Sequence, residues 1–301
     1  GPGITNLGNG TAMFDPALAG IGGPYQIVYT YSDNWGCENS KTKLVTVYAL
    51  PVVDFSGLAP QYCVNANPVT LTGNHAPDGF FSGIGITNIG LGQAIFDPAA
   101  AGVGGPYTIT YTYTDPHGCS NAKSKTVTVN ALPTASFTGL NVDYCLNDPQ
   151  DTLVGNMAPY GTFTGPGITN NNNGTAFFKP SVAGAGGPYT ITYSYIDPNG
   201  CSASQSQTTI VFALPQVSFT GLNPMYCVNA NPILLQGNHA PFGEFSGPGI
   251  TDHFNGTATF DPTAAGVGTH QITYSYTNTN GCTNSQTKTV VINALPNISF
   301  T

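Results

Sequence analysis

The stretch Tyr189–Ile196, which reads YTITYSYI, carries the clearest structural signal in the chain. Tyrosines and one isoleucine alternate with threonines and a serine, and a two-residue period in an aromatic and β-branched run is typical of a strand with one buried face. Asp197–Gly200 then predicts a tight turn, and Thr208–Phe212 predicts the returning strand. We therefore expect a long antiparallel hairpin.

Shorter strand signals precede this hairpin. They fall at Thr134–Thr138, Thr152–Val154, Thr162–Thr164 and Thr175–Phe178. No segment shows the period of a helix. Six or seven short strands joined by turns bury their apolar faces best as two packed sheets. The sequence therefore predicts an all-β fold, an immunoglobulin-like antiparallel β-sandwich.

The same pattern recurs along the chain. Gly-Pro-Gly-Ile-Thr at Gly165 has counterparts that begin at Gly1, Gly83 and Gly247, each start 82 residues from the next. Ala-Leu-Pro recurs in step with them, at Ala49, Ala131, Ala213 and Ala294. A constant period indicates that each repeat is one folding unit, so we expect tandem sandwich modules.

We place the module limits at Ala-Leu-Pro, because proline ends a central strand. This predicts the C-terminal part of a module at 1–50, whole modules at 51–132, 133–214 and 215–295, and the first strand of another at 296–301. The chain then reads as a window from a longer protein, so its lack of a signal peptide carries little weight. No flexible spacer separates modules, and short proline-bearing linkers are semi-rigid.

The composition excludes some functions. Charged residues make up 7% of the chain, arginine is absent and the net charge is −8. A nucleic-acid binder needs clustered Lys and Arg, so we expect no nucleic-acid partner. With 40% hydrophobic residues, 16 Tyr and 16 Phe, the chain has ample surface to bury. A weakly charged surface permits close packing against neighbouring copies.

The seven cysteines form two series. Cys63, Cys145 and Cys227 each follow a tyrosine near the start of a module. Cys37, Cys119, Cys201 and Cys282 each follow a glycine in the turn before the last strand. Such regular placement predicts disulfides and an oxidising compartment.

Two disulfide pairings stay open. The favoured pairing lies within modules: Cys63–Cys119, Cys145–Cys201 and Cys227–Cys282, with Cys37 unpaired. Closing each loop of about 56 residues would stabilise a module by about 4 kcal/mol on the chain-entropy model. The alternative pairs successive modules, as Cys63–Cys201 and Cys145–Cys282, because the first connection and the last hairpin of an immunoglobulin-like fold lie at opposite ends.

No catalytic constellation is visible. His75 and His239 share a position with Met157, and His117, His253 and His270 have no counterparts, so we interpret the histidines as loop residues. Asp15, Asp97 and Asp261 follow a phenylalanine where the third copy has Lys179, which favours a role in capping a turn. We expect no enzyme activity, no catalytic residue and no cofactor.

Calcium is the one metal worth weighing. Structural calcium could sit near Asp33, Asp115 and Asp197, but calcium sites need several converging oxygens and Asn278 replaces the acid in the last module.

Two further side-chain patterns recur. Tyr25, Tyr29, Tyr31 and their equivalents could stack on sugars, but they share a face with Ile27, which favours core packing. Lysines on the last strand (Lys41, Lys43, Lys123, Lys125 and Lys288) either block edge pairing or lie on a solvated face.

The motifs together resemble a known family. YCVNANP from Tyr226, FSGPGI from Phe245, FDP from Phe260, AAGVG from Ala264, ITYSY from Ile272 and NGC from Asn280 look like the immunoglobulin-like repeats of very large secreted and surface proteins of the Bacteroidota. Those proteins include gliding adhesins and other type IX secretion substrates. The resemblance implies a bacterial cell-surface location and an adhesive or filamentous role, with no catalytic residues.

The predicted function is structural. We expect the repeat region of an extracellular filament or giant cell-surface adhesin, acting as a semi-rigid shaft. The alternative is a non-catalytic spacer, or carbohydrate-binding repeats, of a larger secreted enzyme. Expected partners are adjacent modules or neighbouring copies of the chain, with surface glycans as a further candidate and no membrane insertion in this stretch.

Overall fold

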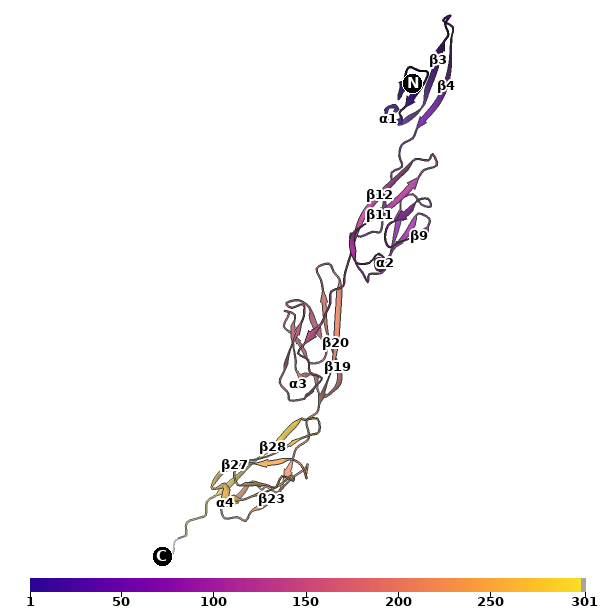
Figure 1. Ribbon diagram of the computed structural model, residues 1–301. Coiled ribbons are helices and arrows are strands. Elements are labelled where there is room, and N and C mark those ends of the chain that lie inside the picture. Colours follow the sequence, from indigo (N-terminus) through magenta and orange to yellow (C-terminus); the bar gives the residue numbers. More distant parts are fainter. Residues whose placement is uncertain (299–301) are drawn as a thin grey trace. The chain divides into compact units, whose positions relative to one another are not determined.

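The computed structural model describes residues 1–298, and these are mostly β-strand (Figure 1). The chain groups into two compact units. One holds Gly1–Pro133 together with the turn Asp197–Cys201, and the other holds the remaining residues. Each repeat is described below by itself.

The first segment contains two two-stranded sheets, β1-β2 and β3-β4. Its elements are β1 (Ile4–Asn6), β2 (Ala12–Phe14), α1 (Pro16–Ala19), β3 (Gly22–Ser32) and β4 (Glu38–Val47).

The next repeat contains two four-stranded sheets, in the orders β5-β7-β10-β9 and β6-β12-β11-β8. Its elements are β5 (Phe55–Ser56), β6 (Gln61–Cys63), β7 (Val69–Gly73), β8 (Phe80–Ser82), β9 (Ile86–Gly90), β10 (Gln93–Phe96), α2 (Pro98–Ala101), β11 (Gly104–Thr114) and β12 (Ser120–Asn130).

The following repeat has the same two sheets, β13-β15-β18-β17 and β14-β20-β19-β16. Its elements are β13 (Phe137–Thr138), β14 (Asp143–Cys145), β15 (Asp151–Gly155), β16 (Thr162–Thr164), β17 (Ile168–Asn170), β18 (Thr175–Phe178), α3 (Pro180–Ala183), β19 (Gly186–Ile196) and β20 (Ser202–Phe212).

The last complete repeat again has these sheets, β21-β23-β26-β25 and β22-β28-β27-β24. Its elements are β21 (Phe219–Thr220), β22 (Met225–Cys227), β23 (Ile233–Gly237), β24 (Glu244–Ser246), β25 (Ile250–Asp252), β26 (Thr257–Phe260), α4 (Pro262–Ala265), β27 (Gly268–Thr277) and β28 (Thr283–Asn293).

These strand orders confirm the predicted fold class. When the strands are lettered along the chain, the first sheet, β5-β7-β10-β9, corresponds to the A-B-E-D sheet of a constant-type immunoglobulin domain. In the second sheet, β12, β11 and β8 correspond to the G, F and C strands of that domain. The protein is a tandem array of immunoglobulin-like β-sandwiches with a period of 82 residues. The module limits at 51, 133 and 215 stay a prediction, and part of the strand expected at 296–301 lies outside the described residues.

Each complete repeat buries one hydrophobic core between its sheets. In the 133–214 repeat, Leu153 and Phe178 of one sheet meet Ile191 and Tyr193 of the other, and all four have no exposed surface. The tyrosine hydroxyl remains satisfied, because Tyr193 donates a hydrogen bond of 2.7 Å to the carbonyl of Tyr160. The two-residue alternation of the YTITYSYI stretch therefore arises because one face of this strand packs in the core.

A glycine lies directly beneath the core tyrosine. A Cβ added at Gly155 would lie 2.1 Å from Cζ of Tyr193, and one added at Gly73 would lie 2.0 Å from Cζ of Tyr111. No side chain fits at that distance, so the close approach of the ring to the neighbouring sheet requires glycine at this position.

The structure corrects the expectation of strands alone. A one-turn helix follows β10 because Asp97 accepts hydrogen bonds from the amides of Ala99 (2.9 Å) and Ala100 (3.4 Å), while Pro98 occupies the first helical position. Asp15 and Asp261 cap α1 and α4 in the same way, which confirms their capping role. Lys179 makes no side-chain cap, yet α3 forms.

Two short strands of each repeat went unpredicted. In the 133–214 repeat these are β14 and β17, of three residues each. The strand β14 runs parallel to β20, with Cys145 opposite Phe212. The sheet is therefore not purely antiparallel, and this parallel pair positions the first cysteine series.

Candidate functional site: the cysteine-bearing ends of the repeats

The hairpin turn holds its cysteine through one acidic side chain. In the turn 115–119, the carboxylate of Asp115 accepts hydrogen bonds from the amides of His117 (2.9 Å) and Cys119 (2.8 Å). The Asp115 amide donates in return to the Cys119 carbonyl (2.9 Å). The turns at 33–37 and 197–201 repeat this arrangement.

The last copy of the turn forms the same arrangement without an aspartate. Asn278 accepts from the amides of Asn280 and Cys282 at 3.0 Å each, so a neutral oxygen fills the position as well as a carboxylate does. Within residues 1–298, no three His, Cys, Asp or Glu side chains lie where they could hold a metal ion. The turn aspartates accept hydrogen bonds from the backbone amides of their own turns.

The other cysteine series sits at the opposite end of the sandwich. Cys145 ends β14, next to the last residue of β20, whereas the hairpin turn precedes the first residue of β20. Figure 1 shows the same separation in each complete repeat, with the hairpin turn and the one-turn helix at opposite ends. An 11-residue strand at ~3.3 Å per residue puts about 35 Å between the two cysteines of one repeat.

A tyrosine anchors each cysteine of this series. The ring of Tyr144 packs against Phe178, with 5.0 Å between centroids. Its hydroxyl accepts from the Asn141 amide (2.9 Å) and donates to the Asp151 carboxylate (2.8 Å). Burial, helped by the Asp151 carboxylate, raises the pKa of Tyr144 to about 12. Tyr62 and Tyr226 pack likewise against Phe96 and Phe260.

The favoured disulfide pairing within modules is wrong. Cys63 is bonded to Cys201 and Cys145 to Cys282, with Cα–Cα distances of 5.5 and 5.4 Å. The pairings Cys63–Cys119, Cys145–Cys201 and Cys227–Cys282 would each have to span the strand of about 35 Å, far beyond the 4.4–6.8 Å that a disulfide allows. The alternative, in which successive repeats are linked, is the one that the structure contains.

Within each cysteine series, the bonded members are less exposed than the free ones. Cys201 and Cys282 have no exposed surface. Cys119 is half-buried and free, and Cys37 and Cys227 are exposed and free. Cys37 was expected to be unpaired, whereas the other two were not. Beside one disulfide, the Asn147 amide also donates to the Thr283 carbonyl, at 3.4 Å.

Two of the five lysines of the last strand, Lys125 and Lys288, have a different role from either expected one. The Lys288 ammonium donates to the Phe219 carbonyl at 2.6 Å and lies 4.6 Å above the Phe219 ring. Lys125 contacts Phe55 in the same way. These lysines tie one sheet to the first strand of the other. Lys41, Lys43 and Lys123 are exposed.

The histidines stack on tyrosines or form hydrogen bonds with neighbouring groups. His75 stacks on Tyr113 with centroids 3.9 Å apart, and His239 stacks on Tyr276 at the same distance. His117 stacks on Tyr48 at 3.8 Å. In the shortened copy of the repeat, His270 Nε2 donates to the Gly266 carbonyl at 2.8 Å, where Tyr189 donates to the Gly184 carbonyl. His253 binds two threonine hydroxyls.

The tyrosine stripe is core in the complete repeats. Tyr111, Tyr193 and Tyr274 have no exposed surface, and burial raises the pKa of each above its usual value. Tyr29 and Tyr31 are 57% and 62% exposed, because residues 1–50 contain no strands that would cover them.

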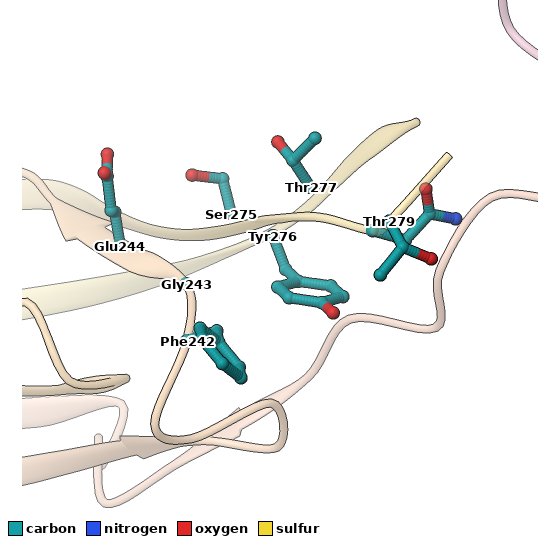
Figure 2. Close-up of a pocket in the computed structure, with 8 residues that line it drawn as sticks. Phe242, Gly243, Glu244, Ser275, Tyr276, Thr277 and Thr279 are labelled. Carbon is teal, nitrogen blue, oxygen red and sulfur yellow. The ribbon is translucent and has the colours of Figure 1, made fainter. Parts of the chain in front are cut away.

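One open cleft lies beside the last hairpin (Figure 2). It has a volume of about 420 Å³ and is lined by Phe242, Gly243, Glu244 and Ser275–Thr279. Figure 2 shows the rings of Phe242 and Tyr276 on one side of the strand, while Glu244, Ser275 and Thr277 project to the other. The polar groups therefore do not converge on the exposed ring.

No protein-family profile and no curated protein matches this chain in sequence. Among solved structures, a Ca²⁺-stabilised adhesin with which an Antarctic bacterium binds ice is 13% identical; 88% of this chain and 81% of that chain are covered, with a TM-score of 0.34. Invasin, a bacterial integrin-binding protein, is 15% identical; 90% of this chain and 65% of that chain are covered, with a TM-score of 0.33. A tetra-tandem repeat from the extending region of a large adhesion protein is 14% identical; 88% of this chain and 81% of that chain are covered, with a TM-score of 0.27. Likeness at this level carries no argument about function.

No helix among the described residues has both the length and the apolar character needed to cross a lipid bilayer.

Proposed function

We propose that this chain is the structural repeat region of an extracellular filament or giant cell-surface adhesin, in which it acts as a semi-rigid, non-catalytic shaft. The observation that carries the proposal is the second covalent link between successive repeats. In addition to the peptide chain, the Cys145–Cys282 disulfide joins the end of one sandwich to the hairpin turn of the next. Two attachment points restrict a hinge far more than one does.

The joints leave little free chain. The carbonyl of Pro215, the last residue of Ala-Leu-Pro, accepts from the Asn284 side chain at 2.8 Å, and the carbonyl of the next residue, Gln216, accepts from the Asn238 side chain at 2.8 Å. Pro51 is held in the same way by Asn121, at 2.8 Å. The linker is therefore part of the folded repeat, and short proline-bearing linkers of this kind act as semi-rigid spacers.

The reactive side chains have structural roles. The turn aspartates accept backbone amides, the histidines stack or bind neighbouring groups, and four of seven cysteines are in disulfides. Disulfides of this regularity are formed in oxidising compartments, which supports a location outside the cell. The motif resemblance supports a bacterial surface, Bacteroidota origin and type IX secretion as parts of the same proposal.

The stiffness of the stapled joint is directly testable. Spin labels on non-canonical residues at the exposed positions Thr164 and Ser246 report the distance between the 133–214 and 215–295 repeats by double electron–electron resonance. We expect a single narrow distribution that broadens in the Cys145→Ser/Cys282→Ser variant. A broad distribution in the unaltered chain, unchanged by the variant, would show a flexible string and overturn the shaft.

Carbohydrate binding receives less support. A saccharide platform needs exposed rings with polar groups converging beside them, and the tyrosines of the sheet face are buried. The Phe242 cleft has the exposed ring, at 65%, without the convergence. Surface glycans stay a prediction. A saccharide array would test it: binding that is lost in Phe242→Ala and kept in Tyr160→Ala would revive the alternative.

A further inference from the structure

Each disulfide between successive repeats joins one buried cysteine to one partly exposed cysteine. Cys201 and Cys282, in the hairpin turns, have no exposed surface, whereas their partners Cys63 and Cys145, at the ends of short strands, are partly exposed. We propose that these disulfides form a thiol-sensitive switch. An external thiol opens each one at the strand cysteine, and the first residue of the hairpin turn sets the speed of opening.

Burial decides which sulfur an external thiol can reach. In thiol–disulfide exchange, the thiolate must contact the sulfur that it attacks. No molecule from the solvent can contact Cys282, which is 0% exposed, whereas Cys145 at the end of β14 is accessible. The same difference holds between Cys201 and Cys63. The turn cysteine is therefore the leaving group in both disulfides.

The two leaving sulfurs lie in turns whose first residues differ in charge. The Asp197 carboxylate accepts from the Cys201 amide at 2.8 Å, and the Asn278 side-chain oxygen accepts from the Cys282 amide at 3.0 Å. Both side chains therefore hold their turns in the same way, but only Asp197 is charged. A thiolate that leaves as Cys201 forms beside a carboxylate, whereas one that leaves as Cys282 forms beside a neutral amide.

This charge affects the rate of exchange. Two negative charges a few ångströms apart repel each other, and a neighbouring carboxylate disfavours the ionised form of a thiol. A thiolate that is less stable leaves more slowly. Asp197 therefore protects the Cys63–Cys201 disulfide. Asn278 leaves the Cys145–Cys282 disulfide, between the 133–214 and 215–295 repeats, without this protection.

The two disulfides also differ at the sulfur that is attacked. The Asp148 carboxylate accepts from the Cys145 amide at 2.7 Å, whereas Ala66 stands at the corresponding position after Cys63. Asp148 repels an incoming thiolate, so it acts against the effect of Asn278. Only a change of the turn residue within one disulfide therefore isolates its contribution.

The exchange needs no oxidant. The external thiolate bonds to the Cys145 sulfur, and the electron pair of the broken Cys145–Cys282 bond leaves with the Cys282 sulfur, which takes a proton from water. One disulfide replaces another, and attack by the Cys282 thiolate on the mixed disulfide closes the joint again. The open joint keeps the peptide chain and the contact from Asn147 to Thr283. That opening loosens the shaft rests on the proposed function; the exchange itself does not.

The side of attack is tested on the full chain, with its free thiols first blocked by iodoacetamide. The probe is 2-mercaptoethanol, added briefly and quenched with excess N-ethylmaleimide, and peptide mapping without reduction locates each group. We expect mercaptoethanol on Cys63 and Cys145, and maleimide on Cys201 and Cys282. Mercaptoethanol on the turn cysteines, or on both cysteines of a disulfide equally, would overturn the proposed side of attack.

Exchanging the two turn residues tests the control of speed. Asn278→Asp should slow the opening of Cys145–Cys282 by roughly three- to tenfold, and Asp197→Asn should accelerate that of Cys63–Cys201 by a similar factor. Each new residue already occurs at this position in another repeat, so both variants keep the turn, and the unaltered disulfide in each sample is the control. Unchanged rates would overturn the role of the turn residue. They would leave the shaft standing, because the spin-label distances measure its stiffness independently.

Discussion

The repeats 51–132 and 133–214 have the same fold but satisfy the same backbone atoms with different side chains. In the second, Gln205 accepts from the Phe137 amide at 3.2 Å and Gln207 donates to the Phe137 carbonyl at 2.9 Å. In the first, Lys125 donates to the carbonyl of Phe55. Lys123 cannot accept a hydrogen bond, and the acceptor for the Phe55 amide is the neighbouring Asp54, at 2.8 Å.

This difference shows that each repeat conserves a hydrogen-bonding requirement while the residue changes. The 133–214 repeat has Gln205 and Ser136 at the positions that Lys123 and Asp54 occupy in the 51–132 repeat. The core beneath shows no such freedom, since Tyr111 and Tyr193 occupy equivalent sites and each packs against two glycines, Gly73 and Gly79 or Gly155 and Gly161. Substitutions should therefore separate features that the repeats share from features that are particular to one.

The largest effect should come from removing a disulfide that joins successive repeats. Removing Cys145–Cys282, as Cys145→Ser/Cys282→Ser, opens a loop with a sequence separation of 137 and should lower the free energy of unfolding by about 4–5 kcal/mol on the chain-entropy model. Denaturant unfolding without reductant measures it. Cys119→Ser, at a free turn cysteine, is the matched control and should change nothing; an equal loss in both would contradict the assignment.

Matched substitutions in the shared core should destabilise the two repeats by the same amount. Gly155→Ala and Gly73→Ala each place a methyl group inside a tyrosine ring, so each should cost about 3 kcal/mol through overpacking. Thermal unfolding compares them. At Gly200 an added Cβ meets nothing, so Gly200→Ala should cost only about 1 kcal/mol for its positive φ of 85°. Unequal losses at 73 and 155 would show that the cores differ.

Alkali should remove the contribution that Tyr144 makes to the free energy of unfolding. Folding raises the pKa of Tyr144 from 10.0 to about 12, so its contribution is complete below pH 10 and is lost as the pH rises from 10 toward 12. Tyr144→Phe removes this alkaline loss and costs about 1–2 kcal/mol at neutral pH, because the Asn141 amide loses its acceptor. Unfolding followed across pH 8–12 tests it; identical pH profiles would refute the role of burial.

The smallest effect should come from Asp54. The hydrogen bond from the Phe55 amide, and then the Lys125 charge 3.4 Å away, lower the pKa of the Asp54 carboxyl below 3.8. Its contribution is present above that value and is lost as the pH falls through the lowered pKa. Carboxyl ¹³C titration should show the pKa rising in Lys125→Gln. Ser136 holds this position in the other repeat, so no such titration should occur there.

The sequence predicted the parts of the fold that a short local pattern determines. The hairpin of Tyr189–Ile196 and its turn follow from alternation and from Asp197, and the 82-residue period follows from identity between copies. The strand β14 has only three residues and pairs with β20, far away in the chain, whereas β17, equally short, pairs with the next strand, β18. The one-turn helices could have been found from Phe-Asp-Pro, since aspartate followed by proline is a helix start.

The disulfides show what a pattern of spacing leaves open. Counting cysteines predicted bonded pairs but favoured neighbours in sequence. The decisive quantity was the length of β20, which puts Cys145 and Cys201 at opposite ends of one sandwich. The topological argument for opposite ends already contained the answer. The roles of Lys125 and Lys288 could not be predicted, because their partners lie on another sheet.

The two disulfides overlap along the chain, since Cys145 lies inside the loop that Cys63 and Cys201 close. When such a chain is pulled, tension passes across both sulfur bridges and only the 56-residue stretch from Cys145 to Cys201 can be drawn out between them. The 219 residues that separate Cys63 from Cys282 would otherwise extend by roughly 3.5 Å each. Even when completely unfolded, the segment from Cys63 to Cys282 would therefore yield only about a quarter of its contour length, until an external thiol cut the bridges.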